Sequence, residues 1–323
     1  MPNLLDIVIY MLPEDLQNIV SSIPNDFLCK LEEIRIRELR PLAIISSGKN
    51  YYIDGDSNPC LSPEDGYIIR NDHTQRILQL ISNYSIYAIE DELRNGYITL
   101  KGGFRVGLAG QTVLENGRIK TLKNINSFNF RISREIKGVA DRVMPMITED
   151  DQIMHTIIIS PPGMGKTTLL RDIARQFSNG FQNFEGVKVS IVDERSEISG
   201  SYKGVPQNDI GYQTDVLVAC PKAEGIMLLI RSMSPDVIIT DEIGRREDMK
   251  AIEEALNAGV KIITSAHGNN LKDVLSRPIL KEVVNSGFFH RILVLGNSKG
   301  IGTLEKVYDA RSMKELLPYP IKL

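Results

Sequence analysis

The sequence has few cysteines and no long apolar run, and each of these absences narrows the kind of protein it encodes. The three cysteines, Cys29, Cys60 and Cys220, lie far apart, and none belongs to a C-x-x-C pair. This spacing argues against a disulfide framework and against a zinc site, and it fits a reducing cytosol. No stretch reaches the ~18 apolar residues that a membrane-spanning helix needs. Because no basic residue precedes the first apolar run, we do not expect a secretory signal peptide.

Tandem repeats and low-complexity tracts are also absent, and the composition, with 42% apolar and 24% charged residues, is that of a globular protein. A chain of 323 residues is too long for one ordinary core, so we expect two domains. The segment MPMITEDD, residues 144–151, combines a proline with an acidic run before a strongly apolar stretch. We therefore predict an N-terminal domain of residues 1–143 and a second domain of residues 144–323. The net charge of −3 gives no overall sign of nucleic-acid binding, although charge can be concentrated locally.

The two parts of the chain differ in their hydrophobic patterns. The N-terminal part mixes helix-like and strand-like segments, which predicts a smaller α+β domain. Its helix-like segments are Pro13–Ile19, Thr74–Ile81 and Ile86–Leu93, and its strand-like segments are Leu31–Arg37, Tyr97–Leu100 and Phe104–Leu108. In the second part, apolar β-branched runs alternate with helix-like segments. These runs are His155–Ser160, Val187–Asp193, Val237–Asp241, Lys261–Ala266 and Ile292–Leu295. The alternation predicts an α/β fold with a mostly parallel sheet and helices on both faces.

The first of these apolar runs leads into SPPGMGKTT, residues 160–168. A phosphate-binding loop needs small residues whose backbone N–H groups face the phosphates, a lysine for the β- and γ-phosphate oxygens, and a hydroxyl for magnesium. The segment matches the pattern G-x-x-x-x-G-K-[ST], except that Ser160 replaces the first glycine. A helix expected over Thr167–Phe177 places its N-terminus under the bound anion. We therefore predict a site for ATP and Mg²⁺, with Thr167 as a metal ligand and the nucleotide bound by Pro161, Pro162, Gly163, Met164, Gly165, Lys166, Thr167 and Thr168.

A second motif, VIITDE at residues 237–242, is an apolar strand that ends in two acids. At such a strand end Asp241 can hold magnesium through water, and Glu242 can polarise the water that attacks the γ-phosphate. Taken alone, the acids are equally compatible with a cap on the following helix. Together with the phosphate loop they predict ATP hydrolysis in a RecA-like P-loop NTPase core. An NKxD motif is absent, which disfavours a GTPase, and a module that merely holds ATP would leave Glu242 without a task.

Two further strands end in polar residues. The run ITSAH at residues 263–267 offers Ser265 or His267 as a group that senses the γ-phosphate or the attacking water. The run IVDERSE at residues 191–197 offers Glu194 as a second carboxylate for the metal or the water, and its alternative interpretation is a solvated charged turn.

Residues 101–142 contain nine Lys and Arg against three acids. In some NTPases an arginine from a partner neutralises the charge that develops on the γ-phosphate. Arg131 and Arg134 lie just before the second domain and are our candidates for this role. A solvated basic face and a nucleic-acid groove are the alternatives. Only Phe104, Phe128 and Phe130 lie among these charges, which leaves few stacking platforms for nucleic-acid bases and makes nucleic acid the less favoured partner.

Several longer segments resemble the stage III sporulation protein AA family of endospore-forming bacteria. They are KAEGIMLLIRSMSPDVIITDEIG at 222–244, IVDERSEISG at 191–200, EEIRIRELRPL at 32–42 and KGGFRVGLAG at 101–110. That family is similar to the secretion-superfamily ATPases of type II and type IV systems, which work as hexameric rings at the inner face of a membrane. The resemblance implies matching roles: Walker A for Lys166 and Thr167, Walker B for Asp241 and Glu242, an acidic box at Glu194 and a histidine box at His267.

The resemblance also implies a function and a place in the cell. We expect a homo-hexameric ATPase in the mother cell, peripheral at the inner face of a membrane and without a span of its own. It would energise a membrane-spanning channel complex that links the mother cell to the forespore, with membrane-embedded channel proteins as partners. The residues leave one alternative function open, an ATPase that is stimulated by nucleic acid bound to the basic N-terminal segment.

Overall fold

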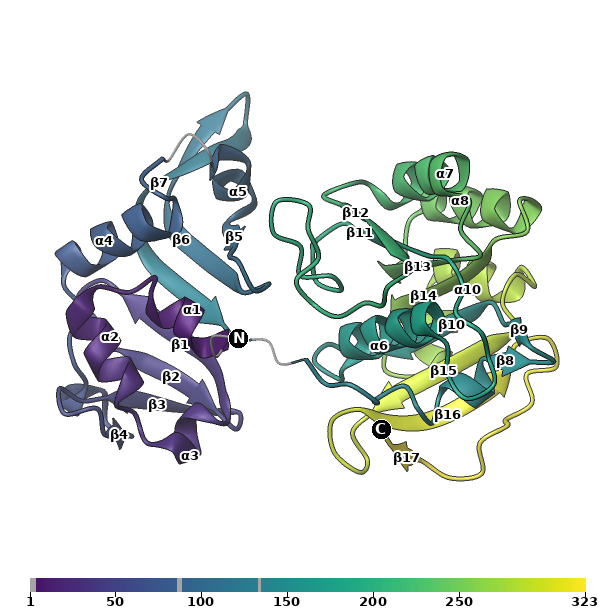
Figure 1. The fold of residues 1–323 in the computed structure, drawn as a ribbon, viewed down its shortest axis with the longest axis horizontal. Helices are drawn as coiled ribbons and strands as arrows, with labels where there is room; N and C mark the ends of the chain where they lie inside the picture. Colours follow the sequence, from purple (N-terminus) through teal and green to yellow (C-terminus); the bar gives the residue numbers. More distant parts are fainter. Residues whose placement is uncertain (1–3, 86–88, 133–134) are drawn as a thin grey trace. The chain divides into compact units, whose positions relative to one another are not determined.

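The computed structural model describes residues 4–85, 89–132 and 135–323. Contacts within the chain divide it into two compact units, Met1–Arg134 and Glu135–Leu323 (Figure 1).

This division lies nine residues before the expected boundary, after residue 134 instead of residue 143. The difference arises because the segment before MPMITEDD already belongs to the second core. Ala140, Val143 and Met144 are fully buried and pack with the second unit. The proline and the acidic run therefore follow the start of the second unit.

The first unit is built on a seven-stranded antiparallel sheet in the order β4-β3-β2-β1-β7-β6-β5. Its strands are β1 (Leu31–Arg37), β2 (Ala43–Ser46), β3 (Lys49–Ile53), β4 (Pro59–Cys60), β5 (Tyr97–Thr99), β6 (Arg105–Glu115) and β7 (Arg118–Arg131). Its helices are α1 (Leu4–Ile9), α2 (Glu14–Ser21), α3 (Asn25–Leu28), η1 (Pro63–Asp65), α4 (Asn71–Ile81) and α5 (Glu90–Asn95). Leu16 of α2 and Ile77 of α4 pack in one core with Ile34 of β1 and Phe130 of β7.

The sequence anticipates several of these elements. The strand expected at Leu31–Arg37 is β1, and the helix expected at Thr74–Ile81 is the larger part of α4. The pair of strands around Gly102-Gly103 is confirmed as β5 and β6, although β6 continues to Glu115. Of the helix expected at Ile86–Leu93, residues 86–88 lie outside the described residues and α5 begins at Glu90.

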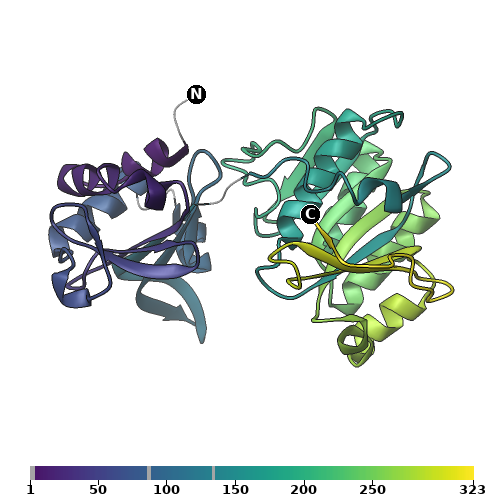
Figure 2. The same cartoon turned by 90° about the horizontal axis from the view of Figure 1, so that it is seen from below.

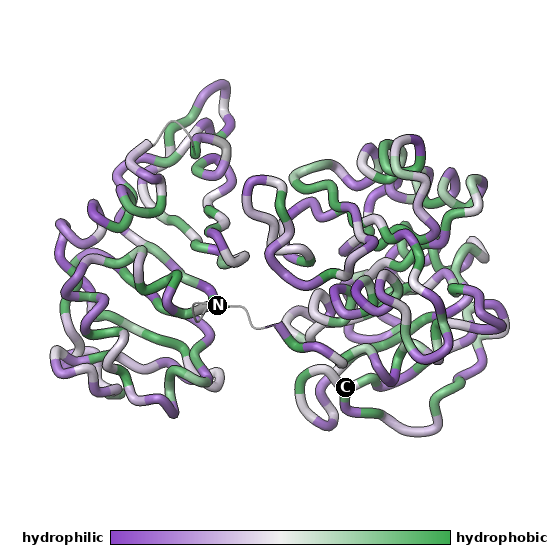
Figure 3. The backbone as a smooth tube through the Cα atoms, in the orientation of Figure 1, coloured by the Kyte–Doolittle hydropathy of each residue, from purple (hydrophilic) through white to green (hydrophobic). Residues whose placement is uncertain are grey.

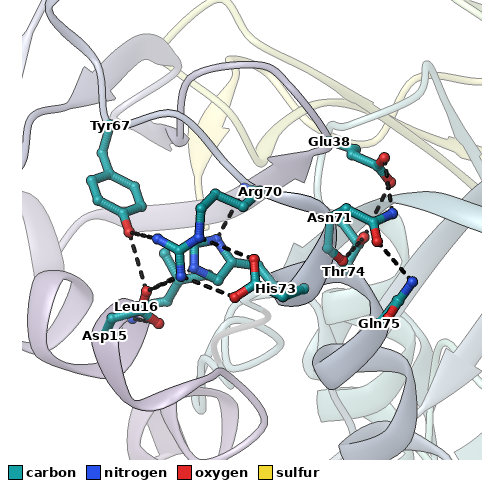
Figure 4. Close-up of polar contacts among 10 residues, drawn as sticks. Asp15, Leu16, Glu38, Tyr67, Arg70, Asn71, His73, Thr74 and Gln75 are labelled. Carbon is teal, nitrogen blue, oxygen red and sulfur yellow. Dashed lines mark hydrogen bonds and ion pairs between the residues drawn. The ribbon is translucent and has the colours of Figure 1, made fainter.

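A polar cluster joins α2 to α4 in the first unit (Figure 4). Oδ2 of Asp15 accepts hydrogen bonds from Nε2 of His73 at 2.7 Å and from Nη2 of Arg70 and the Tyr67 hydroxyl at 3.1 Å each. Nδ1 of the buried His73 accepts from the backbone N–H of Arg70. Burial raises the pKa of Asp15, but hydrogen bonds from His73, from the backbone N–H of Leu16 and from Tyr67 outweigh it, so the pKa lies below its usual value. The cluster therefore ties the two helices through an ionised carboxylate.

The second unit is built on an eight-stranded sheet in the order β12-β11-β13-β14-β10-β15-β16-β17. Its strands are β10 (Thr156–Ser160), β11 (Val189–Asp193), β12 (Thr214–Val218), β13 (Val237–Glu242), β14 (Lys261–His267), β15 (Arg291–Gly296), β16 (Thr303–Asp309) and β17 (Ile321–Lys322). Its helices are η3 (Met144–Met146), α6 (Lys166–Asn179), α7 (Lys222–Met233), α8 (Arg246–Asn257), α9 (Leu271–Leu275) and α10 (Pro278–Asn285), and β8 (Thr148–Glu149) and β9 (Gln152–Ile153) form a small hairpin.

Helices cover both faces of this sheet (Figures 1 and 2). On one face, Leu170 and Phe177 of α6 pack with Ile158 of β10. On the other face, Ile157 of β10 packs with side chains of α7, α8, α9 and α10, including Ile252 of α8. Because neighbouring residues of a strand point to opposite faces, a strand covered on both sides is apolar throughout. Figure 3 shows such hydrophobic stretches along the central strands.

In sheet order, the strands β12, β11, β13, β14, β10 and β15 pair in parallel. Strands β16 and β17 then continue the sheet in the antiparallel direction. The sequence patterns indicate the five central strands but do not anticipate β12, β16 or β17. Among the described residues, no helix is both long and apolar enough to cross a membrane.

Candidate nucleotide site

The loop between β10 and α6 has the backbone that a phosphate-binding loop requires. Gly163 and Gly165 adopt φ values of 74° and 82°, a region that side-chain-bearing residues avoid. Gly165 is also the N-cap of α6, which begins at Lys166. The loop therefore leads directly to the N-terminus of a 14-residue helix, where unpaired N–H groups attract an anion.

Ser160, which replaces the first glycine of the loop pattern, fits at the end of β10. Its side chain is fully buried, and its hydroxyl donates a hydrogen bond of 2.9 Å to the carbonyl of Pro161. The hydroxyl thus finds a partner within the loop itself.

A cavity of about 580 Å³ lies at the carboxyl end of the parallel strands. Parallel strands point their carboxyl ends to one edge, and ligands of such sheets bind there. The cavity brings together five predicted site residues: Lys166 and Thr167 of the loop, Glu194 after β11, and Asp241 and Glu242 of β13.

The Lys166 ammonium lies 3.4 Å from Oε2 of Glu242. The lysine side chain is largely buried at 15% exposure, whereas that of Glu242 is 47% exposed. Lys166 is expected to bind phosphate and Glu242 to polarise water. Their charged groups therefore lie next to each other in the cavity.

A second lysine, Lys222, joins two other carboxylates. Its ammonium lies 2.7 Å from Oε2 of Glu194 and 3.1 Å from Oδ1 of Asp241. The contact with Glu194 is a hydrogen bond, whereas the Asp241 Oδ1 atom is buried and accepts no hydrogen bond among the described residues. Lys222 therefore neutralises Asp241 without fully satisfying it.

These contacts shift the pKa values of the three groups. Burial raises the pKa of Glu194, but Lys222 outweighs it and holds the pKa below the usual value. Burial raises the pKa of Asp241, Lys222 offsets this only in part, and the charges of Asp193 and Glu197 raise the pKa further. Burial lowers the pKa of Lys222, but its two carboxylate partners outweigh this and raise it.

The preceding acid, Asp193, has a structural role. Its carboxylate accepts hydrogen bonds from the N–H groups of Glu197 and Ser199 at 2.9 and 2.8 Å, and from the Ser199 hydroxyl at 2.6 Å. It holds the turn after β11, so that Glu194 is the acid of this pair that lines the cavity.

The oxygen groups present fit magnesium. Mg²⁺ prefers hard oxygen ligands and is usually held by one or two carboxylates together with substrate phosphates and water. Asp241 and the Thr167 hydroxyl lie on one cavity, and Oδ1 of Asp241 is buried without a hydrogen bond. Among the described residues, no group of three or more His, Cys, Asp or Glu could hold a metal ion.

The two sensor candidates on β14 have different surroundings. Ser265 is fully buried, pairs with Glu242 of β13, and its hydroxyl has no hydrogen-bond partner among the described residues. His267 pairs with Ser160 at the start of the phosphate loop, and its carbonyl accepts a hydrogen bond from Arg277 at 2.8 Å. His267 is not among the residues that line the cavity.

Neither arginine candidate lies within the second unit. Arg131 is the exposed last residue of β7, in the first unit, where it pairs with Glu33 and Arg105. Arg134 lies outside the described residues. The cavity itself contains Arg195 and Arg245, which the motifs did not point to.

Comparisons with known proteins identify the family and the fold of the chain. The family model described as "Sporulation stage III, protein AA" matches residues 6–315. The chain is 47% identical over 299 residues to stage III sporulation protein AA of Bacillus subtilis (strain 168), covering 93% of each chain. Among solved structures, the Legionella pneumophila ATPase DotB matches with a TM-score of 0.54 and 16% identity, over 86% of this chain and 75% of that one. The pilus retraction motor PilT with bound ADP matches with a TM-score of 0.53 and 15% identity, over 92% of this chain and 79% of that one. These structures show that the chain shares the mixed α/β P-loop fold of this ATPase and this pilus retraction motor, as the sequence predicts.

Proposed function

Because this chain belongs to the family of stage III sporulation protein AA, we propose that it is a Mg²⁺-dependent ATPase of the secretion type. Its hydrolysis of ATP energises the assembly or operation of a membrane-spanning channel complex during sporulation. The observation that best supports ATP hydrolysis is that one cavity is lined by Lys166, Thr167, Asp241 and Glu242.

Each residue has a task in this proposal. Lys166 and the N–H groups of the α6 N-terminus bind the phosphates, while Thr167 and Asp241 hold the metal, which, when bound, neutralises charge on the phosphate oxygens. Glu242 orients the attacking water and accepts its proton. Glu194 is the second candidate for the general base, because it lines the same cavity.

The sensor of the γ-phosphate is drawn from the end of β14. Ser265 is the more direct candidate, because its buried hydroxyl lacks a hydrogen-bond partner among the described residues and lies opposite Glu242. His267 is the second candidate, beside the start of the phosphate loop.

The wider proposal concerns assembly and place. We propose a homo-hexameric ring, peripheral at the inner face of a membrane in the mother cell, with membrane-embedded channel proteins as partners. Its support is the family membership and a fold shared with proteins named as an ATPase and a pilus retraction motor.

Steady-state ATP hydrolysis and nucleotide binding by single variants test the proposal. Glu242→Gln should retain ATP binding and lose about two or more orders of magnitude in turnover, because only proton acceptance is removed. Lys166→Ala should lose binding or turnover altogether. Glu254→Gln, an exposed glutamate of α8 outside the cavity, is the matched control and should behave like the wild type.

Undiminished turnover in Glu242→Gln would remove Glu242 from the mechanism, and Glu194→Gln would then be the variant that identifies the base. Absence of hydrolysis in the wild type with magnesium, alone and with its membrane partners, would contradict the proposed function as a whole.

The alternative function is an ATPase stimulated by nucleic acid. The observation in its favour is the β6–β7 hairpin of the first unit, whose outer part carries exposed Arg118, Lys120 and Lys123. Lys120 already pairs with Glu115 at 2.6 Å, which lowers the charge available to phosphates. Hydrolysis that is strongly raised by single-stranded DNA and flat in protein concentration would favour this alternative over the motor.

A further inference from the structure

Lys222 occupies a position that disfavours its charge. It is the first residue of α7, where the helix dipole repels cations and attracts anions. Its side chain is only 12% exposed, so water contributes little to stabilising the ammonium. The charge is therefore stabilised by neighbouring acids, of which Glu194 and Asp241 contact the ammonium directly.

The cavity around Lys222 is strongly acidic. Its lining contains four basic and seven acidic residues, so the lining carries a net negative formal charge. Such a cavity attracts divalent cations, and it favours an anionic nucleotide that enters together with a cation over one that enters alone. The carboxylates of Glu194 and Asp241 both lie close to the Lys222 ammonium, at the end of two adjacent strands.

We propose that Lys222 is an internal counter-ion that holds Glu194 and Asp241 while no nucleotide is bound and so keeps free divalent metal off them. Magnesium is then taken up together with the nucleotide rather than alone. The ammonium is a compact point charge and neutralises both carboxylates from a single position. This inference rests on the proposed function, because it takes Asp241 as the residue that holds the metal.

Lys222 is a positioning residue in this account, since it acts through the two carboxylates. Lys166 cannot replace it, because the Lys166 ammonium contacts Glu242 instead. Removing the Lys222 charge leaves the buried Asp241 and the partly exposed Glu194 without their shared ammonium, and a divalent cation is a partner that can replace it.

Binding of Mn²⁺, as a paramagnetic substitute for Mg²⁺, to the nucleotide-free full-length protein tests the proposal by electron paramagnetic resonance. The wild type should bind free Mn²⁺ weakly, and Lys222→Met should bind it at least about ten-fold more tightly, because the variant exposes two unpaired carboxylates. Lys222→Arg keeps the charge and should resemble the wild type. The double variant Lys222→Met/Glu194→Gln should lose most of the gain.

Lys306→Met is the matched control, since it removes a surface lysine that pairs with Glu315 at 2.7 Å, outside the cavity. If Lys222→Met does not fold, Lys222→Gln supplies the same measurement with a neutral side chain that still donates hydrogen bonds. Mn²⁺ affinity within about two-fold of the wild type in a folded neutral variant would overturn the proposal. Equally tight binding by the wild type would also overturn it. Because the measurement needs no hydrolysis, its failure is distinguishable from loss of ATPase activity.

Discussion

At the scale of single residues, a histidine far from the cavity is the group whose titration bears most on stability. His155 directly precedes β10, at the amino-terminal end of the strand, whereas the phosphate loop follows its carboxyl end. His155 is only 7% exposed. Its Nδ1 accepts a hydrogen bond of 3.1 Å from the N–H of Ile262, and its ring centroid lies 5.1 Å from that of His290. Burial lowers the pKa of His155 to about 4, and the charges of Lys261 and His290 act in the same direction.

This shift predicts a loss of stability in mild acid. Between pH values near 6.5 and 4 the unfolded chain binds a proton at His155 that the folded chain does not, so the free energy of unfolding falls as the pH falls. Between about pH 7.5 and pH 5 the loss from His155 is on the order of 2 kcal/mol. His155→Asn, whose side-chain oxygen can accept the Ile262 hydrogen bond, should lose correspondingly less.

Urea unfolding of wild type and variant at both pH values measures the difference. His290, whose pKa burial also lowers, remains in both proteins and sets the residual pH dependence. Identical pH slopes for wild type and His155→Asn would show that His155 is not the group that titrates.

At the scale of elements, α7 can approach the sheet because it contains a glycine. A Cβ atom on Gly225 would lie 2.7 Å from Cγ1 of Val192 on β11 and 3.3 Å from Sγ of Cys220. Val192 is fully buried in the core and cannot move aside cheaply. Gly225 therefore fixes how closely the first turn of α7 packs on β11, and Lys222 lies in that turn.

Gly225→Ala should destabilise the protein despite its better helix propensity. Alanine gains about 1 kcal/mol over glycine within a helix, whereas overpacking a core costs about 1–3 kcal/mol. The clash also pushes Lys222 away from Glu194, so free Mn²⁺ affinity should rise as it does in Lys222→Met. In a Val192→Ala background the clash is removed, and the same Gly225→Ala change should become neutral or stabilising. Equal effects of Gly225→Ala on unfolding in the two backgrounds would contradict this packing explanation.

The sequence predicts elements best where one local rule determines them. The central strands are apolar on both faces and the phosphate loop has its own spacing, so β10, β11, β13, β14 and the start of α6 follow from pattern alone. The outer part of the β6–β7 hairpin is exposed on both faces and lacks alternation, so no hydrophobic pattern predicts its length. The pair Asn116-Gly117, with φ values of 52° and 75°, was the available signal, since Asn-Gly favours two-residue hairpin turns.

The candidate site divides in the same way. Lys166, Asp241 and Glu242 stand at positions that their motifs define. The role of Lys222 cannot be predicted from a motif, because it depends on how α7 packs beside β11 and β13. No local sequence pattern encodes that packing. A lysine directly after Pro221 at a helix start, against the helix dipole, is the only local sign of its role.

At the scale of the whole molecule, each unit has its own core, and the arginine candidates belong to the end of the first unit. Arg131 is exposed at the end of β7. Such an arginine lies outside the unit that contains the phosphate loop. It can neutralise charge on the nucleotide if it reaches the site of a neighbouring copy of the chain. We therefore predict that Arg131, Arg134 or both act in trans.

Mixing two inactive variants tests this prediction. Lys166→Ala chains lack a working phosphate loop but retain both arginines, whereas Arg131→Ala/Arg134→Ala chains retain the loop and should lose about three orders of magnitude or more in turnover. When the two are co-assembled, an intact loop in one chain meets intact arginines from its neighbour, so ATP hydrolysis should rise well above the sum of the separate activities. A mixture of Lys166→Ala with Glu242→Gln contains no complete site in any combination and should show no rise. Hydrolysis by the first mixture that equals the sum of its parts would mean that the arginines act within their own chain or not at all, and Arg195 and Arg245 of the cavity would then be the cations to examine.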